Sequence, residues 1–331
     1  MATISDVAAL AGVSTATVSR ALNGKSTVDP VLAERVARAV EQLGYTPNGL
    51  ARSLRRRETA VLALIISDVE NPFFTAIARG VEDTAQAAGY SVMLCNSDEN
   101  TAKERRYVEV AAQERLAGVI MSPTTGDSDV RPLLAHRTPI VTIDRRLGSA
   151  DCDAVLVDSR AAAREAVEHL AAQGYRRIGC IAGPPGITTA DERLDGYRDG
   201  LRAAGRRYAA KLVRRCEFRE AGGREAAAQL LAGPDRPDAL LVSSSTMAVG
   251  VLQAMAELGL RSGRDVGIVS FDEAPWATLI SPALTVVAQP AHAMGQLAAR
   301  LLLARIGDRG ERPAATTTLA ARLVVRGSST R

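Results

Sequence analysis

The sequence predicts a small all-α helix-turn-helix head followed by an α/β part made of two doubly wound parallel-sheet lobes. Two patterns carry this prediction. The first 46 residues contain short amphipathic helical stretches separated by glycines, whereas apolar strand patterns alternate with helical ones from Thr59 onward. A chain of 331 residues also suits two or three folded units better than one. We therefore expect a head at residues 1–46, a connecting segment at 47–58 and the α/β part at 59–331.

A pair of short helices is expected at the start of the head. Ser5 is the expected N-cap of the first helix, and Gly12 supplies the left-handed conformation at which that helix ends. Ser14 can cap a second helix over residues 15–23. Two short helices joined by a tight glycine-containing turn form a helix-turn-helix, whose second helix enters the major groove of DNA with its N-terminal residues.

The second helix carries side chains suited to DNA. Arg20 has the fork of donors that matches guanine O6 and N7. Thr15 and Ala16 offer methyl groups and one hydroxyl, which suit a thymine methyl or a water-bridged contact. Short donors suited to phosphates are Ser14, Thr17, Ser19 and Asn23. A helical pair that binds no nucleic acid is the alternative interpretation.

A third helix and a basic segment follow. Asp29-Pro30 is an N-cap with proline at the first helical position, and the helix that it opens is expected to end at Leu43. Between Asn48 and Arg55 only about two helical turns fit, too few to be stable alone in water. Two interpretations of this segment stay open. It is either a plain linker between domains or a segment that folds only against DNA, with Leu54 as a wedge in the minor groove.

The excess positive charge lies in the head and the segment after it. Residues 1–57 contain eight Lys/Arg and four Asp/Glu, a net charge of +4. Of the 41 basic and 37 acidic residues in the whole chain, the remaining 33 and 33 cancel. A basic surplus at this end agrees with a phosphate contact there.

Eight apolar stretches of the α/β part are predicted as strands, and helical patterns lie between them. The strands lie at residues 61–66, 91–95, 118–121, 140–143, 154–157, 178–181, 239–242 and 266–271. The first four are assigned to one lobe, placed at about 59–152 plus 288–316. The last four are assigned to a second lobe at about 153–287 plus 317–327, and residues 326–331 are expected to be a frayed tail.

Cysteine and histidine usage indicates neither disulfides nor a metal site. Cys95, Cys152, Cys180 and Cys216 are widely spaced and form no CxxC pair. We find no signal peptide and no apolar run near eighteen residues, so we expect reduced core thiols in a cytoplasmic protein without a membrane span. His136, His169 and His292 lack metal-ligand spacing, and no metal or cofactor is expected.

Chemistry is expected where the predicted strands end, because the carboxyl ends of parallel strands meet at one edge of each lobe. Asn71-Pro72-Phe73-Phe74 lies just beyond the first strand, Asp144-Arg145 follows the fourth and Asp272 follows the last. Carboxylates and guanidinium groups pair with vicinal hydroxyls, and aromatic rings cover the apolar face of a sugar. These residues predict a cleft for a polyhydroxylated ring, and they suit helix caps and core positions equally well.

The head resembles that of the lactose-repressor (LacI/GalR) family of bacterial transcription regulators. The resemblance rests on residues 3–8, 13–23 and 44–48, and it continues through nearly the whole chain. It implies a homodimer on a pseudo-palindromic operator, with residues 47–58 as paired hinge helices that kink a central base step. The implied DNA contacts are Thr3, Ser14, Thr15, Ala16, Thr17, Ser19, Arg20, Asn23, Asn48, Leu54 and Arg55. Gly49 departs from the pattern and makes the hinge about 1 kcal/mol less helical than alanine would.

The α/β part resembles the effector domain of the same family, which is similar to periplasmic sugar-binding proteins of the ribose type. The implied effector contacts are Asn71, Phe73, Phe74, Asp144, Arg145, Arg193, Ser244, Asp272 and Gln289. Ser244-Ser245 departs from the pattern, which has Asn-Asp there. Because a hydroxyl cannot span the two contacts of an amide, the sugar stays open. A pentose such as ribose is the first choice, and a hexose or a nucleoside is the second.

Together these features predict a ligand-responsive repressor of a carbohydrate-utilisation operon. Its expected partners are double-stranded operator DNA, a sugar, sugar phosphate or nucleoside, and a second copy of the chain. Closure of the cleft on the effector is expected to move the amino-terminal lobes of the dimer and so change DNA affinity. Whether the effector induces or co-represses stays open.

Two other classes of protein are disfavoured. The sequence has no G-x-S-x-G, Walker A or G-x-G-x-x-G motif, and the prolines of Gly183-Pro184-Pro185-Gly186 remove the amide donors of a phosphate cradle, so we do not expect an enzyme. A sugar-binding transport protein is the second alternative, and the head and the missing signal peptide argue against it. A purine- or nucleoside-responsive regulator of the same family is the alternative within the class.

Overall fold

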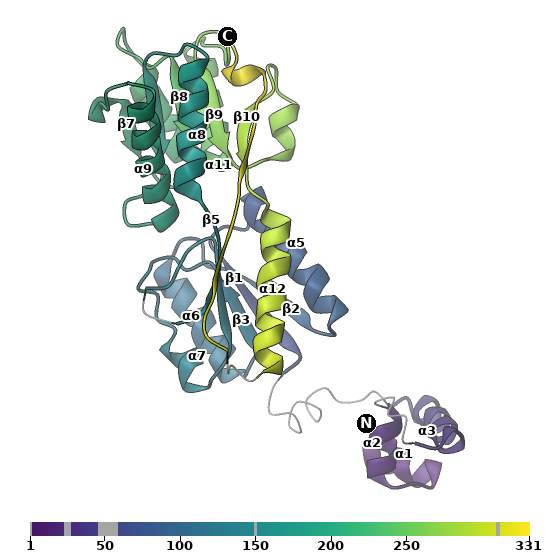
Figure 1. The fold of residues 1–331 in the computed structure, drawn as a ribbon. Helices are drawn as coiled ribbons and strands as arrows, with labels where there is room; N and C mark the ends of the chain where they lie inside the picture. Colours follow the sequence, from purple (N-terminus) through teal and green to yellow (C-terminus); the bar gives the residue numbers. More distant parts are fainter. Residues whose placement is uncertain (1, 23–27, 46–58, 149–150, 309–311) are drawn as a thin grey trace. The chain divides into compact units, whose positions relative to one another are not determined.

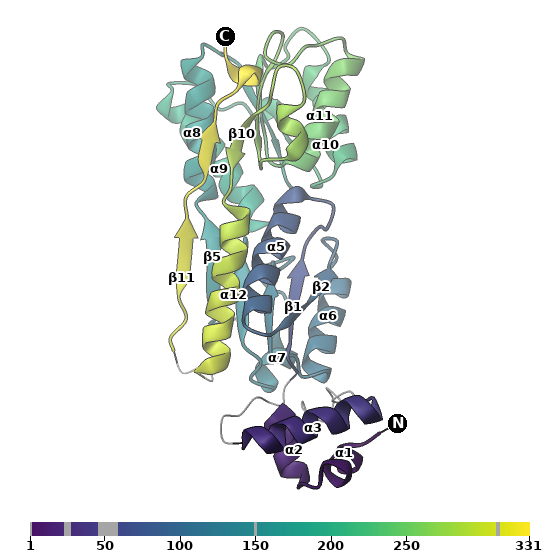
Figure 2. The ribbon, with the colours of Figure 1, turned by 90° about the vertical axis from the view of Figure 1, so that its right-hand side faces the viewer.

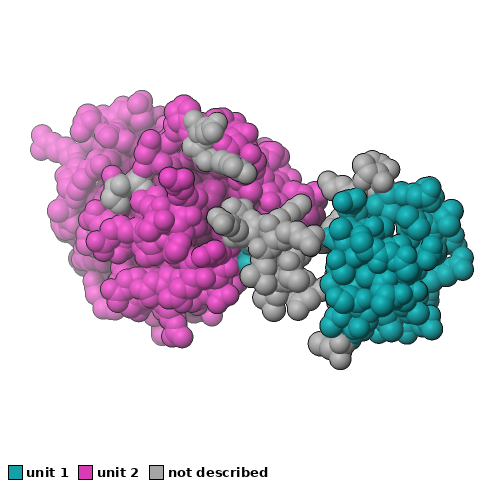
Figure 3. Space-filling model, turned by 90° about the horizontal axis from the view of Figure 1, so that it is seen from below, with its two compact units in different colours: residues 1–59 teal, residues 60–331 magenta. Residues whose placement is uncertain are grey.

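The computed structural model describes residues 2–22, 28–45, 59–148, 151–308 and 312–331. Its backbone forms two compact units, residues 1–59 and 60–331, which Figure 3 draws in different colours. The first unit is all-α, and the second contains two sheets with helices on their faces, as the sequence predicts. Each sheet has six strands, whereas the sequence predicts four in each lobe. None of the described helices has both the length and the apolar character needed to cross a bilayer.

Three helices build the head around a small apolar core. They are α1 (Ile4–Ala11), α2 (Thr15–Leu22) and α3 (Pro30–Leu43). Gly12 ends α1 in the left-handed conformation, at φ 62° and ψ 40°, as predicted. Each helix contributes a fully or almost fully buried valine to the core: Val7, Val18 and Val36. The core therefore fixes the angle between α1 and α2, and with it the helix-turn-helix.

The predicted N-cap at Ser5 is wrong. Thr3 caps α1 instead, because its hydroxyl accepts a hydrogen bond from the Asp6 backbone N–H. The Asp6 carboxylate in turn accepts from the Thr3 backbone N–H at 2.7 Å, which completes a capping box. The same contacts hold the pKa of the Asp6 carboxyl below its ordinary value.

The first lobe is an all-parallel sheet in the order β11-β5-β4-β3-β1-β2. Its strands are β1 (Val61–Ile66), β2 (Ser91–Asn96), β3 (Gly118–Met121), β4 (Ile140–Ile143), β5 (Asp153–Val157) and β11 (Thr316–Leu319). Helices α5 (Pro72–Ala87) and α12 (Ala291–Gly307) cover one face, and α6 (Thr101–Gln113) and α7 (Arg131–Ala135) cover the other (Figures 1 and 2). Because both faces are covered, β1 is apolar at every position.

The second lobe repeats this plan with one antiparallel edge strand, in the order β12-β10-β9-β8-β6-β7. Its strands are β6 (Ile178–Ala182), β7 (Val213–Arg215), β8 (Ala239–Val242), β9 (Gly267–Phe271), β10 (Thr285–Ala288) and β12 (Arg322–Val324). Helices α8 (Ser159–Ala172) and α9 (Thr188–Ala203) pack on one face, and α10 (Glu220–Leu231) and α11 (Ser245–Glu257) pack on the other (Figure 2). The carboxyl ends of both sheets therefore supply the loops of one site.

The sheets correct the expected boundaries of the lobes. The strand assigned to the second lobe at residues 154–157 is β5, which pairs with β4 and belongs to the first lobe. β11 pairs with β5, so residues 317–319 also belong to the first lobe, whereas β12 lies in the second. An apolar strand pattern reveals burial but not which neighbour the strand pairs with, and this is why the boundary was misplaced.

The last residues of the chain are ordered and not a frayed tail. Ser328 and Ser329, in the short helix η3 (Gly327–Ser329), are both 0% exposed. The Ser328 hydroxyl donates to the Ile268 carbonyl at 2.7 Å and accepts from the Thr285 backbone N–H at 2.7 Å. The prediction from composition failed because these hydrogen bonds to β9 and β10 order a polar segment.

Helices α5 and α12 approach each other closely at two glycines. A Cβ atom on Gly80 would lie 2.1 Å from the His292 carbonyl oxygen, and one on Gly295 would lie 2.2 Å from the Ile77 carbonyl oxygen. Only residues without a side chain allow this approach. The contact holds the start of α12, which follows Gln289, beside α5, which follows Asn71.

Candidate functional sites

Helix α2 presents the predicted base-contacting residues to solvent. Thr15, Ala16 and Arg20 are exposed, whereas Val18 is fully buried against α1 and α3. Ala16 and Arg20 are four residues apart and so share a face of the helix. The start of α2 is therefore accessible to a DNA groove.

The hydroxyls before and within α2 are already ordered by the chain. The Ser14 hydroxyl accepts from the Thr17 backbone N–H at 3.1 Å, which confirms Ser14 as the predicted cap of α2. The two side-chain oxygens lie 2.9 Å apart. Both side chains thus have fixed positions from which to meet a phosphate.

The remaining predicted DNA contacts are placed only in part. Thr3 is exposed, with its hydroxyl bound to Asp6 at 2.8 Å, and Ser19 is half-buried on α2. The predictions for Asn23, Asn48, Leu54 and Arg55 lie outside the described residues, as do Gly49 and the segment 47–58.

The α/β unit has a polar pocket between its lobes, with about 410 Å³ of empty space between atoms. It is lined by Asp68, Asn71, Phe73, Phe74, Glu99, Asp144, Arg145, Thr189, Arg193, Phe218, Arg219, Ser244 and Asp272. The structure thus brings together eight of the nine predicted effector residues, and the ninth, Gln289, bonds to one of them. Only about 30 Å³ of this space is open to the centre of a water-sized molecule, so the lining side chains leave little free room in the pocket.

Asn71 and the neighbouring rings of Phe73 and Phe74 line the pocket from the start of α5. Asn71 is the N-cap of α5, and its side-chain oxygen accepts from the Phe73 backbone N–H at 2.9 Å. Phe73 and Phe74 are buried and meet edge to face, with centroids 5.1 Å apart. Asn71 is therefore a helix cap and Phe73 and Phe74 are core residues, and all three also line the pocket.

Asp144 and Asp272 occupy equivalent positions in the two lobes. Each follows a central strand with a left-handed backbone, at φ 67° and 70°, which aspartate tolerates better than most residues. Each donates its backbone N–H to the next strand, Asp144 to the Val155 carbonyl and Asp272 to the Val287 carbonyl. Burial raises the pKa of both carboxyls, and nearby arginines oppose the rise.

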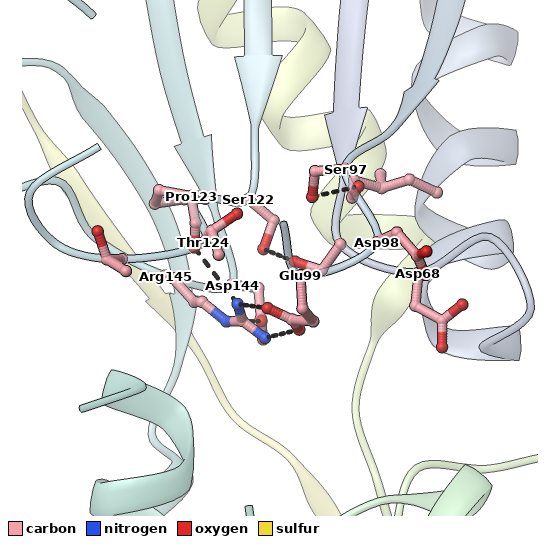
Figure 4. A network of polar contacts seen from close by, with 12 residues as sticks. Asp68, Ser97, Asp98, Glu99, Ser122, Pro123, Thr124, Asp144 and Arg145 are labelled. Atoms are coloured by element: carbon pink, nitrogen blue, oxygen red, sulfur yellow. Dashed lines mark hydrogen bonds and ion pairs between the residues drawn. The ribbon is translucent and has the colours of Figure 1, made fainter. Parts of the chain in front are cut away.

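Arg145 is locked into a buried ion pair. Its two terminal nitrogens donate to the carboxylate of Glu99 at 2.6 and 2.8 Å, and Figure 4 shows the two groups facing each other. The Arg145 side chain is only 5% exposed. Its Nε lies 3.5 Å from an Asp144 carboxylate oxygen and has no hydrogen-bond partner among the described residues. One donor and one acceptor are therefore left side by side for a ligand hydroxyl.

Arg193 supplies the cation of the opposite wall. It lies on α9, one turn after Thr189, and donates to the Ser243 carbonyl at 2.7 Å. Its guanidinium stacks over the Phe271 ring at 4.2 Å from the centroid. Its Nε is buried and has no partner in the described part of the chain.

Gln289 orients Asp272 from the crossing between the lobes. Its Nε2 donates to the Asp272 carboxylate at 2.6 Å, and its Oε1 is buried without a partner among the described residues. Ser244 is the N-cap of α11, and its hydroxyl accepts from the Met247 backbone N–H at 3.2 Å. The serine that departs from the resemblance therefore has a structural role at the wall of the pocket.

Five pocket residues were not among the predicted effector contacts: Asp68, Glu99, Thr189, Phe218 and Arg219. Asp68 and Glu99 follow β1 and β2, so strand ends were a usable signal for them. Arg219 precedes α10 in the second lobe, yet it pairs with Asp68 at 3.0 Å and with Asp98, both in the first lobe. No local pattern marks such a contact between lobes.

Among the described residues, the cysteine and histidine side chains do not form a second site. Cys95 and Cys180 are buried free thiols, and burial raises their pKa to about 11 and about 12. Such thiols are poor nucleophiles at neutral pH. Within the described ranges, no three His, Cys, Asp or Glu side chains are placed to hold a metal ion.

Comparisons with known proteins agree with both units. Residues 3–48 match a family described as "Bacterial regulatory proteins, lacI family", and residues 167–329 match a "Periplasmic binding protein-like domain". The ribose operon repressor of Halalkalibacterium halodurans is 37% identical, over 92% of this chain and 91% of that protein.

Two solved structures are similar over the whole chain. The transcriptional regulator CelR in complex with cellobiose is 32% identical, with a TM-score of 0.75, over 99% of this chain and 100% of that one. The lac repressor dimer bound to operator and an anti-inducer is 26% identical, with a TM-score of 0.88, over 100% and 99%. The fold and the order of the two units are shared throughout.

Proposed function

The chain belongs to the LacI family of bacterial regulatory proteins, and from this premise we propose that it represses a carbohydrate-utilisation operon in response to a pentose such as ribose. It is a transcriptional repressor and not an enzyme. The observation that carries the proposal is the combination, in one chain, of an exposed recognition helix and a two-lobed pocket lined by paired acids and arginines.

The similarity to a relative supports a pentose, and the lining of the pocket supports a sugar in general. The relative that is 37% identical over nearly its whole length is named a ribose operon repressor. The pocket offers Asp144, Arg145 and Asp272 for hydroxyls and Phe73 and Phe74 for the C–H face of a ring. This combination of polar groups and rings suits a sugar.

Repression requires DNA, and we infer that the operator is a pseudo-palindrome read by a homodimer. One α2 helix reads one half-site, so two-fold symmetry in the protein calls for two half-sites in the DNA. We infer that a second copy covers apolar side chains that both lobes expose to solvent, among them Leu94, which is 46% exposed, and Leu279, which is 82% exposed. The structure of the lac repressor named above is a dimer on its operator.

The route from pocket to DNA is closure of the two lobes on the effector. Arg219 of the second lobe holds Asp68 and Asp98 of the first, beside the pocket. A ligand that stabilises this arrangement changes DNA affinity only by the difference between its affinities for the open and closed states. We propose that this difference moves the amino-terminal lobes of the dimer and, through residues 47–58, the heads.

The test is binding of the full chain to fragments of candidate promoters, measured by fluorescence anisotropy with and without D-ribose. Specific binding is expected to fall steeply with salt, because phosphate contacts release counterions, and to change when D-ribose is added. A protein that shows no preference for any operator-like fragment over random duplex would contradict the proposal.

Arg20→Ala is expected to weaken operator binding by about 1–3 kcal/mol and to relax the preference at one base pair, because a bidentate guanine contact is lost. The comparison is made across operators changed one position at a time. Equal losses on all of them would make Arg20 a phosphate contact.

A further inference from the structure

Acidic groups outnumber basic ones in the lining of the pocket. The lining contains three guanidinium groups, those of Arg145, Arg193 and Arg219. It contains four carboxylates, those of Asp68, Glu99, Asp144 and Asp272, so the formal balance is 3 − 4 = −1. With all four carboxyls counted as ionised, a negatively charged ligand would enter a site that already has one negative charge in excess.

Arg145 is the cation best shaped to hold an anion, because its planar fork matches phosphate and carboxylate. That fork is already taken. Both terminal nitrogens donate to Glu99, and one of them also lies 3.4 Å from the Pro123 carbonyl oxygen (Figure 4). The carboxylates of Asp144 and Glu104 act on the same guanidinium electrostatically.

Glu99 is held in place from its backbone outward. Its backbone N–H donates to the Ser67 carbonyl at 3.1 Å, and its φ of 52° fixes the turn after β2. Its side chain is only 16% exposed. A phosphate that displaced it from Arg145 would leave a carboxylate buried without its partner, which is strongly unfavourable.

Arg219 repeats the pattern at the edge of the pocket. Its guanidinium is held by the carboxylates of Asp68 and Asp98, so it too has acidic partners before any ligand arrives. Arg193 donates to a backbone carbonyl, and Asp144 and Asp272 both lie close enough for its charge to lower their pKa. A phosphate placed on Arg193 would therefore meet two aspartates.

We propose that Glu99 determines the class of effector: by occupying the fork of Arg145 it excludes phosphorylated and carboxylated ligands, so the pocket takes an uncharged polyhydroxylated molecule. The donor left on Arg145 is its Nε, beside the Asp144 carboxylate, and this pair fits one hydroxyl that both accepts and donates. The proposal rests on the proposed function, because it names the chemistry of the same pocket.

The test compares a sugar with its own phosphate. D-ribose and D-ribose 5-phosphate are titrated into the full chain by calorimetry, with the wild type, Glu99→Gln and the control Glu70→Gln. Glu70→Gln also removes one negative charge, but Glu70 follows β1, is exposed and lies outside the pocket lining. Wild type and control are expected to bind D-ribose at least about 100-fold more tightly than the 5-phosphate, since like charges in a desolvated site are strongly disfavoured.

In Glu99→Gln this ratio is expected to fall at least about tenfold, mainly through tighter binding of the phosphate, because the amide keeps the shape but removes the negative charge paired with the two terminal nitrogens of Arg145. A wild type that binds the two ligands within about threefold would overturn the proposal, and so would a ratio that Glu99→Gln leaves unchanged. A wild type that fails to discriminate overturns the proposal even if the variant does not fold.

Inorganic phosphate separates this proposal from the choice of sugar. It is expected to raise the melting temperature of Glu99→Gln and not that of the wild type, relative to sodium chloride at equal ionic strength. If D-ribose binds neither protein, the proposed pentose is wrong, yet the phosphate result still decides the role of Glu99. Equal stabilisation of both proteins by phosphate would overturn that role.

Discussion

The two walls of the pocket are built on the same backbone plan but neutralise their charges differently. Asp144 and Asp272 follow equivalent strands with the same left-handed conformation. On the first wall, Asp144 stands beside Arg145, whose charge is held by the carboxylate of Glu99. On the second, Asp272 is bonded to the neutral amide of Gln289, and Arg193 donates to a carbonyl.

This difference makes the first wall rigid and allows the second wall to rearrange when a ligand binds. A buried ion pair with two short hydrogen bonds resists rearrangement, because breaking it exposes unpaired charge to a low dielectric. An amide–carboxylate contact can exchange one hydrogen-bond partner for a ligand hydroxyl at small cost. We therefore expect the first wall to set which ligands enter and the second wall to carry the response to them.

The largest effect is expected from a substitution that removes the cation of the first wall. Arg145→Ala leaves Glu99 and Asp144 buried without their cation and is expected to lower the free energy of unfolding by about 3–5 kcal/mol. Arg193→Ala, on the second wall, is expected to cost less, about 1–3 kcal/mol, because Arg193 donates to a carbonyl, stacks on Phe271 and acts on Asp144 and Asp272 only at longer range. Urea unfolding of the full chain measures both. Equal losses would contradict the contrast between the walls.

The second prediction concerns the loss of the carboxylate of the second wall and its effect on effector binding. Asp272→Ala removes the acceptor that Gln289 orients and is expected to weaken effector binding roughly 10–100-fold, as for other hydrogen bonds to charged groups. Operator binding without effector should be unchanged, since the head is a separate unit. Asp235→Ala is the matched control, because the Asp235 side chain is 77% exposed. An effector titration of Asp272→Ala that matches the control would remove Asp272 from the site.

A smaller effect concerns the contact that joins the two walls. Arg219→Ala removes the ion pairs from the second lobe to Asp68 and Asp98. Because the Arg219 side chain is 34% exposed, solvent screens these pairs, and effector affinity should fall by no more than about fivefold. Small-angle scattering of the ligand-free protein should show a larger radius of gyration than for the wild type. An unchanged radius and affinity would show that Arg219 does not hold the lobes together.

The sequence predicts a feature well when neighbouring residues determine it and poorly when residues far apart in the chain determine it. The cap at Ser14, the stop at Gly12 and the positions of Asp144 and Asp272 after their strands follow from neighbouring residues, and the structure has them as predicted. Composition and alternation were also enough for the fold class, because burial on both faces of a parallel sheet imposes a continuous apolar pattern.

What the sequence did not reveal was decided by partners far away in the chain. Glu99 meets Arg145 across 46 positions, and Asp98 meets Arg219 across 121. The sheet to which β5 belongs was misassigned for the same reason, since its neighbour is chosen by the topology and not by its own residues. Thr3 in place of Ser5 shows that even a local cap is decided by which of two candidates finds a reciprocal partner, here Asp6.

The smallest predicted effect is a pH dependence of stability that is confined to the second lobe, where the end of the chain packs against the sheet. His169 on α8 lies 2.8 Å from the hydroxyl of Ser329, which lies 2.7 Å from that of Thr285. Burial lowers the pKa of His169 below its ordinary value of 6.5, so the folded protein favours the neutral ring. The resulting stability is present above pH 6.5 and is lost as the pH falls through the lowered pKa, because the unfolded chain takes up the proton first.

Since the ring is only half-buried, this contribution should stay below about 1 kcal/mol. His169→Gln is expected to flatten the fall in melting temperature between pH 7 and pH 5, with hydrogen exchange near η3 becoming insensitive to pH. Asp153 and Arg305, which hold the end of α12 in the first lobe, serve as the comparison, since neither is a histidine. Two outcomes would show that His169 does not control how the carboxyl-terminal segment is held. One is that acid increases hydrogen exchange in the first lobe as much as in the second, and the other is that His169→Gln behaves like the wild type.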